Sequence, residues 1–502
     1  MTQLIHRSEI TFGEIDAKNA LITRDKAARR LFLDAFVLPS SVDMDAILRG
    51  DRFLIYGAKG SGKTALLRYV MEDQEKKKNA SKFIIFNEDI TDQEFEKIGD
   101  KIDFDTILKP DIADSINVRS MWDIFIIGKI CDMLSERTDI FDDGSKINKL
   151  KTIIADALDY KSKTALERLL KKIKSGTIRL SAGAKEYAEL EAIINFENGD
   201  GTVEINYSLF ADVITDKICN FSFAEDVRFN LFIDELNLAM LAQKQHKKDS
   251  ILIRDLIVSV GRLNRIFTEK NVPIYIYAAV RVEVAKALNA SRNEIDKYLI
   301  DKGQLMQWHD GFEIERYPIF EIIEQRISVI ESNSVGKSND ASTIWGSYFN
   351  RDIFNISPKK FISEVTWCNP RDIVNLFNLA SKSQMSRPRY DTDVFAGIAH
   401  QYSELVWSER AEELNADHSM TIVNNIKKLM SGYYNHFNIG TLTKHAENVS
   451  QSNQIVAQML NTIGIERICR DMYYVGILGQ FVINRYRRDN FNRKIPEDIH
   501  SV

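Results

Sequence analysis

Short apolar runs, each bounded by polar residues, divide this 502-residue chain into alternating strands and helices. Such compact runs are typical of strands buried in a parallel sheet. Segments of helical periodicity lie between them, most clearly 251–267, whose apolar residues gather on one side. The pattern therefore predicts an α/β fold with a parallel sheet. The strand candidates are 53–56, 83–86, 230–233 and 273–280, with 305–309 as a weaker fifth.

The same periodicity indicates how the chain is divided into domains. Residues 98–221 are mainly helical, with turns and short strands over 176–203, and they separate the second strand candidate from the third. This separation is longer than strand–helix crossovers need, so we expect an insertion in the sheet domain. From Tyr317 onward the pattern is helical. We expect a helical lead-in (1–48), a core in two parts (49–97 and 225–315), a mainly helical insertion (98–224), a helical lid (316–400) and a C-terminal domain (401–502).

A glycine-rich segment follows the first apolar run. Residues 57–64 read Gly-Ala-Lys-Gly-Ser-Gly-Lys-Thr, the complete G-x-x-x-x-G-K-T form of a phosphate-binding loop, and a helical pattern begins at Ala65. Glycines let the loop turn its N–H groups inward, at a helix N-terminus that favours anions. Lys63 is expected to reach the β- and γ-phosphates of ATP, and Thr64 to bind Mg²⁺. The expected nucleotide contacts are Gly57, Ala58, Lys59, Gly60, Ser61, Gly62, Lys63, Thr64 and Ala65.

Two acidic residues end the third apolar run. Asp234 and Glu235 follow 230–233, which places them at the carboxyl edge of a parallel strand, where open α/β sheets bind their ligands. Beside a phosphate loop, Asp234 would hold Mg²⁺ through water, and Glu235 would orient or deprotonate the attacking water. The alternative is a pair of acids at a helix start, where they favour the helix dipole.

Two arginines are candidates for contact with the phosphates. Arg281 is the first charge after the run 273–280, so it would lie close to that phosphate. Asn369 is a good N-cap and Pro370 fits the first helical position, which puts Arg371 in the first turn of a lid helix. The alternatives are an arginine that simply leaves the core and an exposed surface arginine.

The last hundred residues combine short helical patterns with a basic tip. The run 481–483 leads to Arg485-Tyr486-Arg487-Arg488, followed by further aromatic and basic residues. Short helices followed by a hairpin describe a winged helix, and basic residues among aromatic ones suit a nucleic-acid backbone. Winged helices also dock proteins, and charged tips are often only solvated. A nucleic-acid partner and a protein partner therefore both stay open.

Composition narrows the partners and the compartment. The net charge of −5 and the pI near 6.0 exclude a generally basic protein, so any nucleic-acid contact must be local. Cys131, Cys219, Cys368 and Cys469 lie far apart, which predicts neither a disulfide framework nor a metal site. No stretch reaches the roughly 18 apolar residues of a membrane helix, and no signal region follows the first residues. We expect a cytoplasmic protein without a membrane partner.

Together these motifs resemble the AAA+/STAND branch of P-loop ATPases. The order of ATPase core, helical lid and winged helix is similar to that of origin-recognition and initiator proteins. The resemblance rests on residues 57–64, on Phe232-Ile233-Asp234-Glu235, on Arg281 and on Asn369-Pro370-Arg371. It implies an ATPase whose Arg281 and Arg371 are sensors and which works as a homo-oligomer or with a partner protein. The chain also resembles bacterial P-loop ATPases encoded beside antiphage or DNA-processing genes.

The chain departs from this resemblance in two respects. It carries Asp-Glu-Leu-Asn at 234–237 where many STAND proteins have paired aspartates, which favours hydrolysis over a pure switch. No arginine finger can be fixed, because Arg254, Arg262, Arg265 and Arg292 are all candidates and each could instead be structural.

Two other P-loop classes fit less well. A GTPase needs Asn-Lys-x-Asp, and 148–151 reads Asn-Lys-Leu-Lys. An ABC-type ATPase needs Leu-Ser-Gly-Gly-Gln, and 180–184 reads Leu-Ser-Ala-Gly-Ala. Three functions stay open: an ATP-hydrolysing switch that couples nucleotide state to a partner or DNA, a sensor or scaffold that holds nucleotide with little turnover, and a DNA-loading ATPase.

Overall fold

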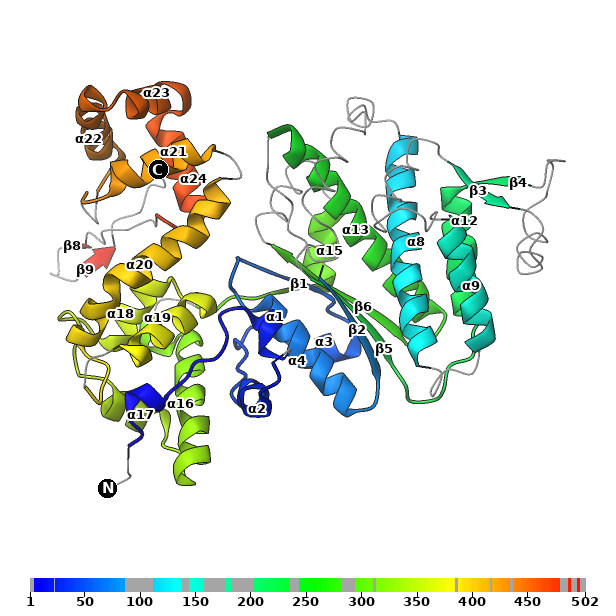
Figure 1. The fold of residues 1–502 in the computed structure, drawn as a ribbon, viewed down its shortest axis with the longest axis horizontal. Helices are drawn as coiled ribbons and strands as arrows, with labels where there is room; N and C mark the ends of the chain where they lie inside the picture. The colour runs from blue at the N-terminus through cyan, green and yellow to red at the C-terminus, as the bar shows by residue number, and fades with distance from the viewer. Residues whose placement is uncertain are drawn as a thin grey trace. The chain divides into compact units, whose positions relative to one another are not determined.

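The computed structural model divides the chain into two compact units (Figure 1). The first unit holds residues 1–239 and 243–402, and the second holds 240–242 and 403–502. No helix in the described part of the chain is long and apolar enough to cross a membrane. The structure describes residues 4–21, 23–85, 112–137, 144–157, 177–181, 202–234, 243–281, 294–309, 313–383, 387–415, 418–433, 437–478, 486–488 and 494–496.

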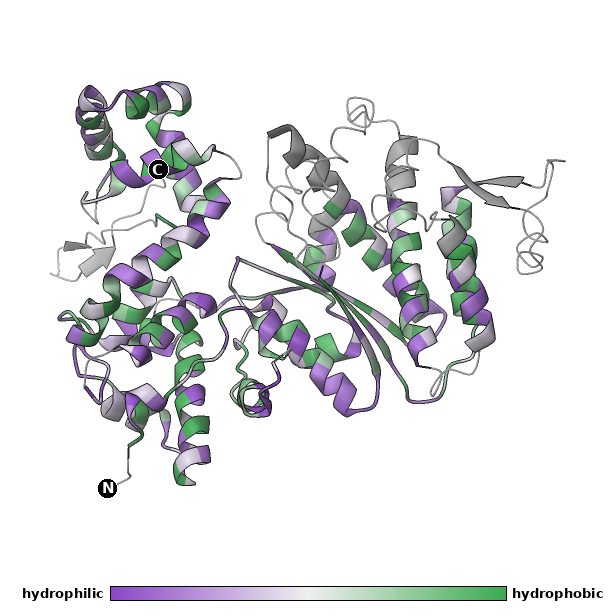
Figure 2. Ribbon diagram, in the orientation of Figure 1, coloured by the Kyte–Doolittle hydropathy of each residue, from purple (hydrophilic) through white to green (hydrophobic). Residues whose placement is uncertain are grey.

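A five-stranded parallel sheet forms the centre of the first unit. Its order is β2-β5-β6-β1-β7, so two strands separate β1 from β2. In the flavodoxin-like order 2-1-3-4-5, by contrast, strands 1 and 2 are neighbours. All of β5 is buried, and hydrophobic residues run along the strands (Figure 2). The predicted α/β fold with a parallel sheet is confirmed. The strands are β1 (Leu54–Gly57), β2 (Ala80–Ile85), β5 (Phe229–Asp234), β6 (Ile274–Arg281) and β7 (Gly303–Leu305).

Strand register brings the carboxyl ends of β1, β5 and β6 to one edge of the sheet. β6 lies between the other two strands and pairs with both. Gly57 of β1 lies beside Arg281, and Ile233 of β5 lies beside Ala278. Asp234, which follows Ile233, therefore ends its strand at the same edge. Open α/β sheets bind their ligands at this edge, so the fold gathers the predicted site residues where a ligand would bind.

Helices cover this sheet, and the insertion is attached to one of them. α4 contacts β1, β2, β5 and β6, and α13 contacts β6. α8 of the insertion packs against α9, α12 and α13. Insertion residues 158–176 and 182–201 lie outside the described residues. The elements are α3 (Met44–Arg49), α4 (Lys63–Lys76), α8 (Ile112–Glu136), α9 (Gly144–Ala157), the antiparallel strands β3 (Thr177–Ser181) and β4 (Thr202–Asn206), α12 (Tyr207–Cys219), α13 (Gln243–Glu269) and α15 (Glu294–Lys302).

One guanidinium group links three helices of this region. Arg262 of α13 donates from Nη2 to Asp123 of α8 at 2.6 Å and from Nη1 to Asp212 of α12 at 3.1 Å. The Asp123 side chain is only 3% exposed. Burial raises the pKa of Asp123 to about 6, and the Arg262 charge opposes that rise. The insertion is therefore held on α13 by a buried ion pair as well as by apolar packing.

The lid is helical and incorporates the start of the chain. Phe12 packs on Phe377 of the lid with ring centroids 4.8 Å apart, and the buried Arg7 donates from Nε to the Arg387 carbonyl at 3.2 Å. The described residues 4–16 are largely irregular, so their buried side chains form no clear helical or strand pattern in the sequence. The lid elements are η1 (Arg7–Glu9), η2 (Ile314–Arg316), α16 (Ile319–Val335), α17 (Ala341–Tyr348), α18 (Pro358–Thr366), α19 (Pro370–Lys382) and α20 (Thr392–Leu414), whose residues from 403 onward belong to the second unit.

Two short helices then carry the chain from the lid to the sheet. α2 contacts lid helix α16, where Arg326 donates from Nη1 to the Leu31 carbonyl at 3.3 Å. The second partner of α2 is helix α4, because Arg29 of α2 forms an ion pair with Glu72 of α4. The N-terminal residues thus connect the lid with the helix that follows the phosphate loop. The two helices are α1 (Ala17–Ala20) and α2 (Lys26–Asp34).

The second unit has a hydrophobic core of its own, formed by helices and followed by a hairpin. The buried core includes Ile426, Val456 and Ile468, one from each of three helices. β8 and β9 pair antiparallel, with Arg487 beside Ile495. The elements are α21 (Met420–Met430), α22 (Ile439–Ser452), α23 (Gln454–Ile463), α24 (Ile465–Tyr474), β8 (Tyr486–Arg488) and β9 (Lys494–Pro496).

Replacing Arg262 by methionine is expected to lower the free energy of unfolding by about 3 kcal/mol at pH 8, because Asp123 would be buried without its cation. The pKa of Asp123 would then rise further. A carboxyl group whose folded pKa is raised contributes stability below its unfolded pKa and loses it as the pH rises through the folded pKa. The loss caused by the substitution should therefore be smaller at pH 5 than at pH 8. Urea unfolding at both pH values checks this, and equal losses would contradict it.

Candidate functional site

The phosphate loop connects β1 to α4 through glycines in left-handed conformations. Gly60 has φ +80° and Gly62 has φ +93°, values that side chains other than glycine rarely adopt. Gly62 is also the N-cap of α4, so no side chain caps the first turn of this helix. Lys63 donates from Nζ to the carbonyls of Gly57 at 2.9 Å and Ala58 at 2.8 Å. The loop thus presents a helix N-terminus and a lysine ammonium group on one short segment.

Three successive carbonyl groups of this loop accept hydrogen bonds from outside it. Asn369 donates from Nδ2 to the Lys59 carbonyl at 2.8 Å, and the Arg371 backbone N–H donates to the Gly60 carbonyl at 3.3 Å. The third donor is Trp308, whose Nε1 lies 2.8 Å from the Ser61 carbonyl. Two of the donors belong to the lid, and Trp308 follows strand β7. The loop is therefore held by the lid and by the sheet domain together.

The lid segment lies directly on the loop. A Cβ atom at Gly60 would fall 2.5 Å from Asn369 Oδ1 and 3.0 Å from Arg371 Cβ. Asn369 Oδ1 accepts from the Arg371 N–H at 3.0 Å, the N-cap bond that the sequence predicted. Trp367 and Cys368, just before this cap, have φ of 53° and 52°, an uncommon conformation for such residues. The structure thus places Arg371 beside the loop, while its role as a sensor stays a prediction.

The predicted metal ligands lie on two elements of the same edge. Asp234 ends β5 and is 3% exposed, and Thr64 lies in the first turn of α4. A carboxylate and a hydroxyl are the hard oxygen ligands that Mg²⁺ takes. These donors fit a magnesium ion held between loop and strand. Glu235, the predicted general base, lies outside the described residues.

Arg281 occupies the position between the loop and the acidic strand. β6 stands between β1 and β5, and its last residue, Arg281, lies beside Gly57 in the sheet register. The sequence placed Arg281 after its strand, and the structure makes it the final strand residue. Its backbone therefore lies directly beside the start of the phosphate loop.

Two of the four arginine-finger candidates form ion pairs with buried aspartates. Arg254 pairs with the fully buried Asp255 at 2.8 Å, and Arg262 holds the insertion through Asp123. Arg265 is exposed and pairs with an acid one turn further along α13. Arg292 lies outside the described residues. For Arg254 and Arg262, the structural alternative is thus the better interpretation.

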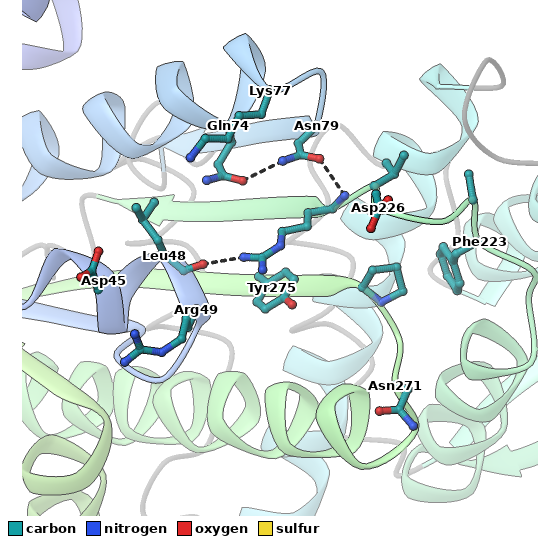
Figure 3. A pocket seen from close by; sticks show the side chains of 14 residues that line it. Asp45, Leu48, Arg49, Gln74, Lys77, Asn79, Phe223, Asp226, Asn271 and Tyr275 are labelled. Atoms are coloured by element: carbon teal, nitrogen blue, oxygen red, sulfur yellow. Dashed lines mark hydrogen bonds between the residues drawn. The ribbon is translucent and has the colours of Figure 1, made fainter.

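A cavity of about 720 Å³ lies at the opposite edge of the sheet (Figure 3). Arg228 lines it, donates from Nη1 to the Leu48 carbonyl at 2.6 Å and lies over the Tyr275 ring. The backbone N–H of Arg228 donates to Asn79, which in turn donates to Gln74. These residues lie at the amino ends of β2, β5 and β6 and at the ends of α3 and α4. Ligands of open sheets bind at the carboxyl ends, so we place the nucleotide site at the loop.

Sequence reasoning missed two contributions to this site. Trp308 was part of a weak strand candidate, and nothing in its neighbourhood indicated that its indole would reach a loop more than two hundred residues earlier. Asn369 was identified as a helix cap, but the second bond from its amide to Lys59 depends on the folded position of the lid. The motif itself and the acidic strand were found from the sequence because each is contiguous.

Replacing Trp308 by phenylalanine keeps an aromatic ring and removes the donor to the Ser61 carbonyl. We expect the unfolding free energy to fall by about 1 kcal/mol, because a buried acceptor loses its partner. Amide hydrogen exchange over 58–64 should become faster. Trp345→Phe is the matched control, since Trp345 donates to Glu324 within the lid. The control should lower the unfolding free energy by a similar amount and leave amide exchange over 58–64 unchanged. If both variants exchanged at the same rate over 58–64, the role of Trp308 would be contradicted.

No protein-family model and no curated protein matches the chain. Among solved structures, the chain is similar to the Aeropyrum pernix ORC1 protein in complex with DNA. The sequence identity is 11%, the TM-score is 0.36, and the match covers 93% of this chain and 92% of that chain. A likeness this low supports no conclusion, and the function is therefore argued from the residues of this chain.

Proposed function

We propose that this protein is an ATPase that works as a nucleotide-dependent switch. The observation that carries the proposal is a juxtaposition at one sheet edge. A complete phosphate loop follows β1, the buried carboxylate of Asp234 ends β5, and Arg281 ends the strand between them. The lid segment with Asn369 and Arg371 is hydrogen-bonded to the loop, which supports the lid as the element that follows nucleotide state.

The loop would bind the phosphates of ATP through its backbone N–H groups and Lys63. The Lys63 ammonium group donates to two loop carbonyls, and on nucleotide binding it would exchange these for oxygens of the β- and γ-phosphates. The start of α4 lacks a side-chain cap, so its first N–H groups would be completed by phosphate. ATP binding would therefore give phosphate partners to the Lys63 ammonium group and to the first N–H groups of α4.

Thr64 and Asp234 would hold Mg²⁺, Thr64 directly and Asp234 through water. The ion would neutralise charge on the β- and γ-phosphates. Glu235, next along the chain, would orient the attacking water or accept its proton. Arg281 from the sheet edge and Arg371 from the lid would stabilise the charge that develops on the γ-phosphate. Catalysis would come mainly from positioning and charge, since phosphoryl transfer needs little covalent help.

The motifs also support finer assignments, which we propose on the resemblance alone. These are membership of the AAA+/STAND branch with an initiator-like layout, assembly as a homo-oligomer or with a partner protein, and a role in bacterial antiphage defence in the cytoplasm. The domain limits at 48, 97, 224, 315 and 400, which follow from the hydrophobic pattern of the sequence, are also part of this proposal. The switch would change the orientation of the lid and, through it, the engagement of the partner.

Lys63→Ala is expected to weaken ATP binding about 100-fold, because the variant has no ammonium group to donate to the phosphates. Glu235→Gln should keep binding and reduce turnover by a factor of about 10² to 10⁴. Lys76→Ala, an exposed lysine at the other end of α4, is the control and should change neither. Equilibrium binding of ATP with Mg²⁺ and time-resolved phosphate release measure both quantities. Full turnover by Glu235→Gln would remove Glu235 from the mechanism, and one stoichiometric burst in the wild type would favour a nucleotide-holding scaffold.

A second candidate function, DNA engagement, is favoured by the hairpin of the second unit. Its first strand is Tyr486–Arg488 and its second begins at Lys494, so basic residues fall on both strands. Arg485 lies outside the described residues. Such a hairpin suits contacts to a phosphate backbone, which would be strongly dependent on salt. A DNA-loading ATPase would combine this contact with the nucleotide site.

Replacing Arg485, Arg487 and Arg488 by alanine should weaken duplex DNA binding and reduce the slope of log affinity against log salt by about 0.9 for each phosphate that the variant no longer neutralises. Fluorescence anisotropy at four salt concentrations measures the slope. The matched control replaces three exposed lysines of the first unit, Lys26, Lys76 and Lys337, and changes the net charge by the same amount. An identical slope in the arginine variant and the wild type would exclude the hairpin as a DNA contact.

A further inference from the structure

The phosphate loop has its peptide groups oriented by donors that lie outside it. In a planar trans peptide the C=O and the next N–H point in opposite directions. Asn369 fixes the Lys59 carbonyl and Trp308 fixes the Ser61 carbonyl, so the N–H groups of Gly60 and Gly62 face away from these donors. The orientation on which anion binding depends is therefore set in part by a lid residue.

Asn369 performs two tasks through two different side-chain atoms. Its Oδ1 accepts from the Arg371 N–H and caps α19, and its Nδ2 donates to the Lys59 carbonyl. Serine and aspartate cap helices about as well, but an ionised aspartate has no donor, and the hydroxyl group of serine is shorter than the asparagine amide and is a single atom that would have to serve both partners. The two partners also fix which amide atom is oxygen, since one is a donor and the other an acceptor. The second bond gives a reason for asparagine at this position beyond capping.

The surroundings hold Asn369 in place from both sides. Pro370 occupies the first turn of α19, and the left-handed conformations of Trp367 and Cys368 direct the chain into the cap. On the loop side Gly60 leaves no room for a side chain, because a Cβ there would fall 2.5 Å from Asn369 Oδ1. Because the two segments are in such close contact, even a small shift of the loop backbone would displace Asn369, the N-cap of α19.

We propose that Asn369 is a positioning residue that couples the backbone of the phosphate loop to the lid. This rests on the proposed function, because it assumes that the loop binds nucleotide. Filling the loop moves the Lys59 and Gly60 peptides, and Asn369 passes that movement to α19. This route needs no contact between Arg371 and a γ-phosphate, so the lid responds to ADP as well as to ATP.

The experiment uses the full-length chain and Mg-ADP, which has no γ-phosphate for Arg371 to sense. The test variant is Asn369→Ser, which keeps a capping oxygen and removes the amide donor. The control is Asn378→Ser on the same helix, where the asparagine amide donates to the Gly13 carbonyl and not to the loop. Equilibrium titration gives the ADP affinity, and amide hydrogen exchange over 366–382, with and without ADP, gives the lid response.

We expect Asn369→Ser to bind ADP about 3- to 10-fold more weakly and to lose at least about half of the ADP-induced change in exchange over 366–382. Asn378→Ser should retain both. A full lid response in Asn369→Ser would overturn the coupling and leave the proposed function intact. Absence of nucleotide binding in the wild type would refute the proposed function itself. If Asn369→Ser does not fold, Asn369→Asp, which caps about as well, replaces it. Its negative charge beside the loop weakens ADP binding by itself, so the lid response at saturating ADP is then the deciding measurement, with the same expected loss.

Discussion

A loop that binds phosphate through its own N–H groups must satisfy its carbonyl groups elsewhere. The chain meets this requirement with donors that are distant in sequence: the amide of Asn369, the backbone of Arg371 and the indole of Trp308. Each bond fixes the rotation of one peptide group, and with it the direction of the following N–H. The site is therefore organised by hydrogen bonds on the outside of the loop as much as by its glycines.

This constraint explains why strand order matters to the site. With β6 between β1 and β5, the last residue of β6 lies beside Gly57, and Arg281 thereby stands between the loop and the strand that ends in Asp234. With β7 on the other side of β1, the chain that leaves β7 passes the loop and brings Trp308 to it. Sheet topology thus supplies a cation on one side of the loop and a neutral donor on the other.

The sequence predicted the parts of the site that are contiguous. The phosphate loop, the acidic end of β5 and the cap before α19 are each encoded within a few residues, so local rules identify them. The contacts of Trp308 and the second bond of Asn369 depend on how distant segments pack, and no local pattern carries that information. The burial of Arg7 and Phe12 against the lid could not be predicted either, because these residues lie in a segment with little regular structure.

That buried start of the chain also limits how the lid can move. Residues up to Phe12 pack with the lid, while Arg29 of α2 pairs with Glu72 on the helix that leaves the phosphate loop. Arg326, whose pKa burial lowers to about 10, bonds to Leu31 on the same short helix. A large rotation of the lid would have to expose this guanidinium group and separate α2 from one of its partners. Small displacements at the loop are therefore more easily accommodated than wide opening, and a hydrogen bond such as that of Asn369 responds to displacements of that size.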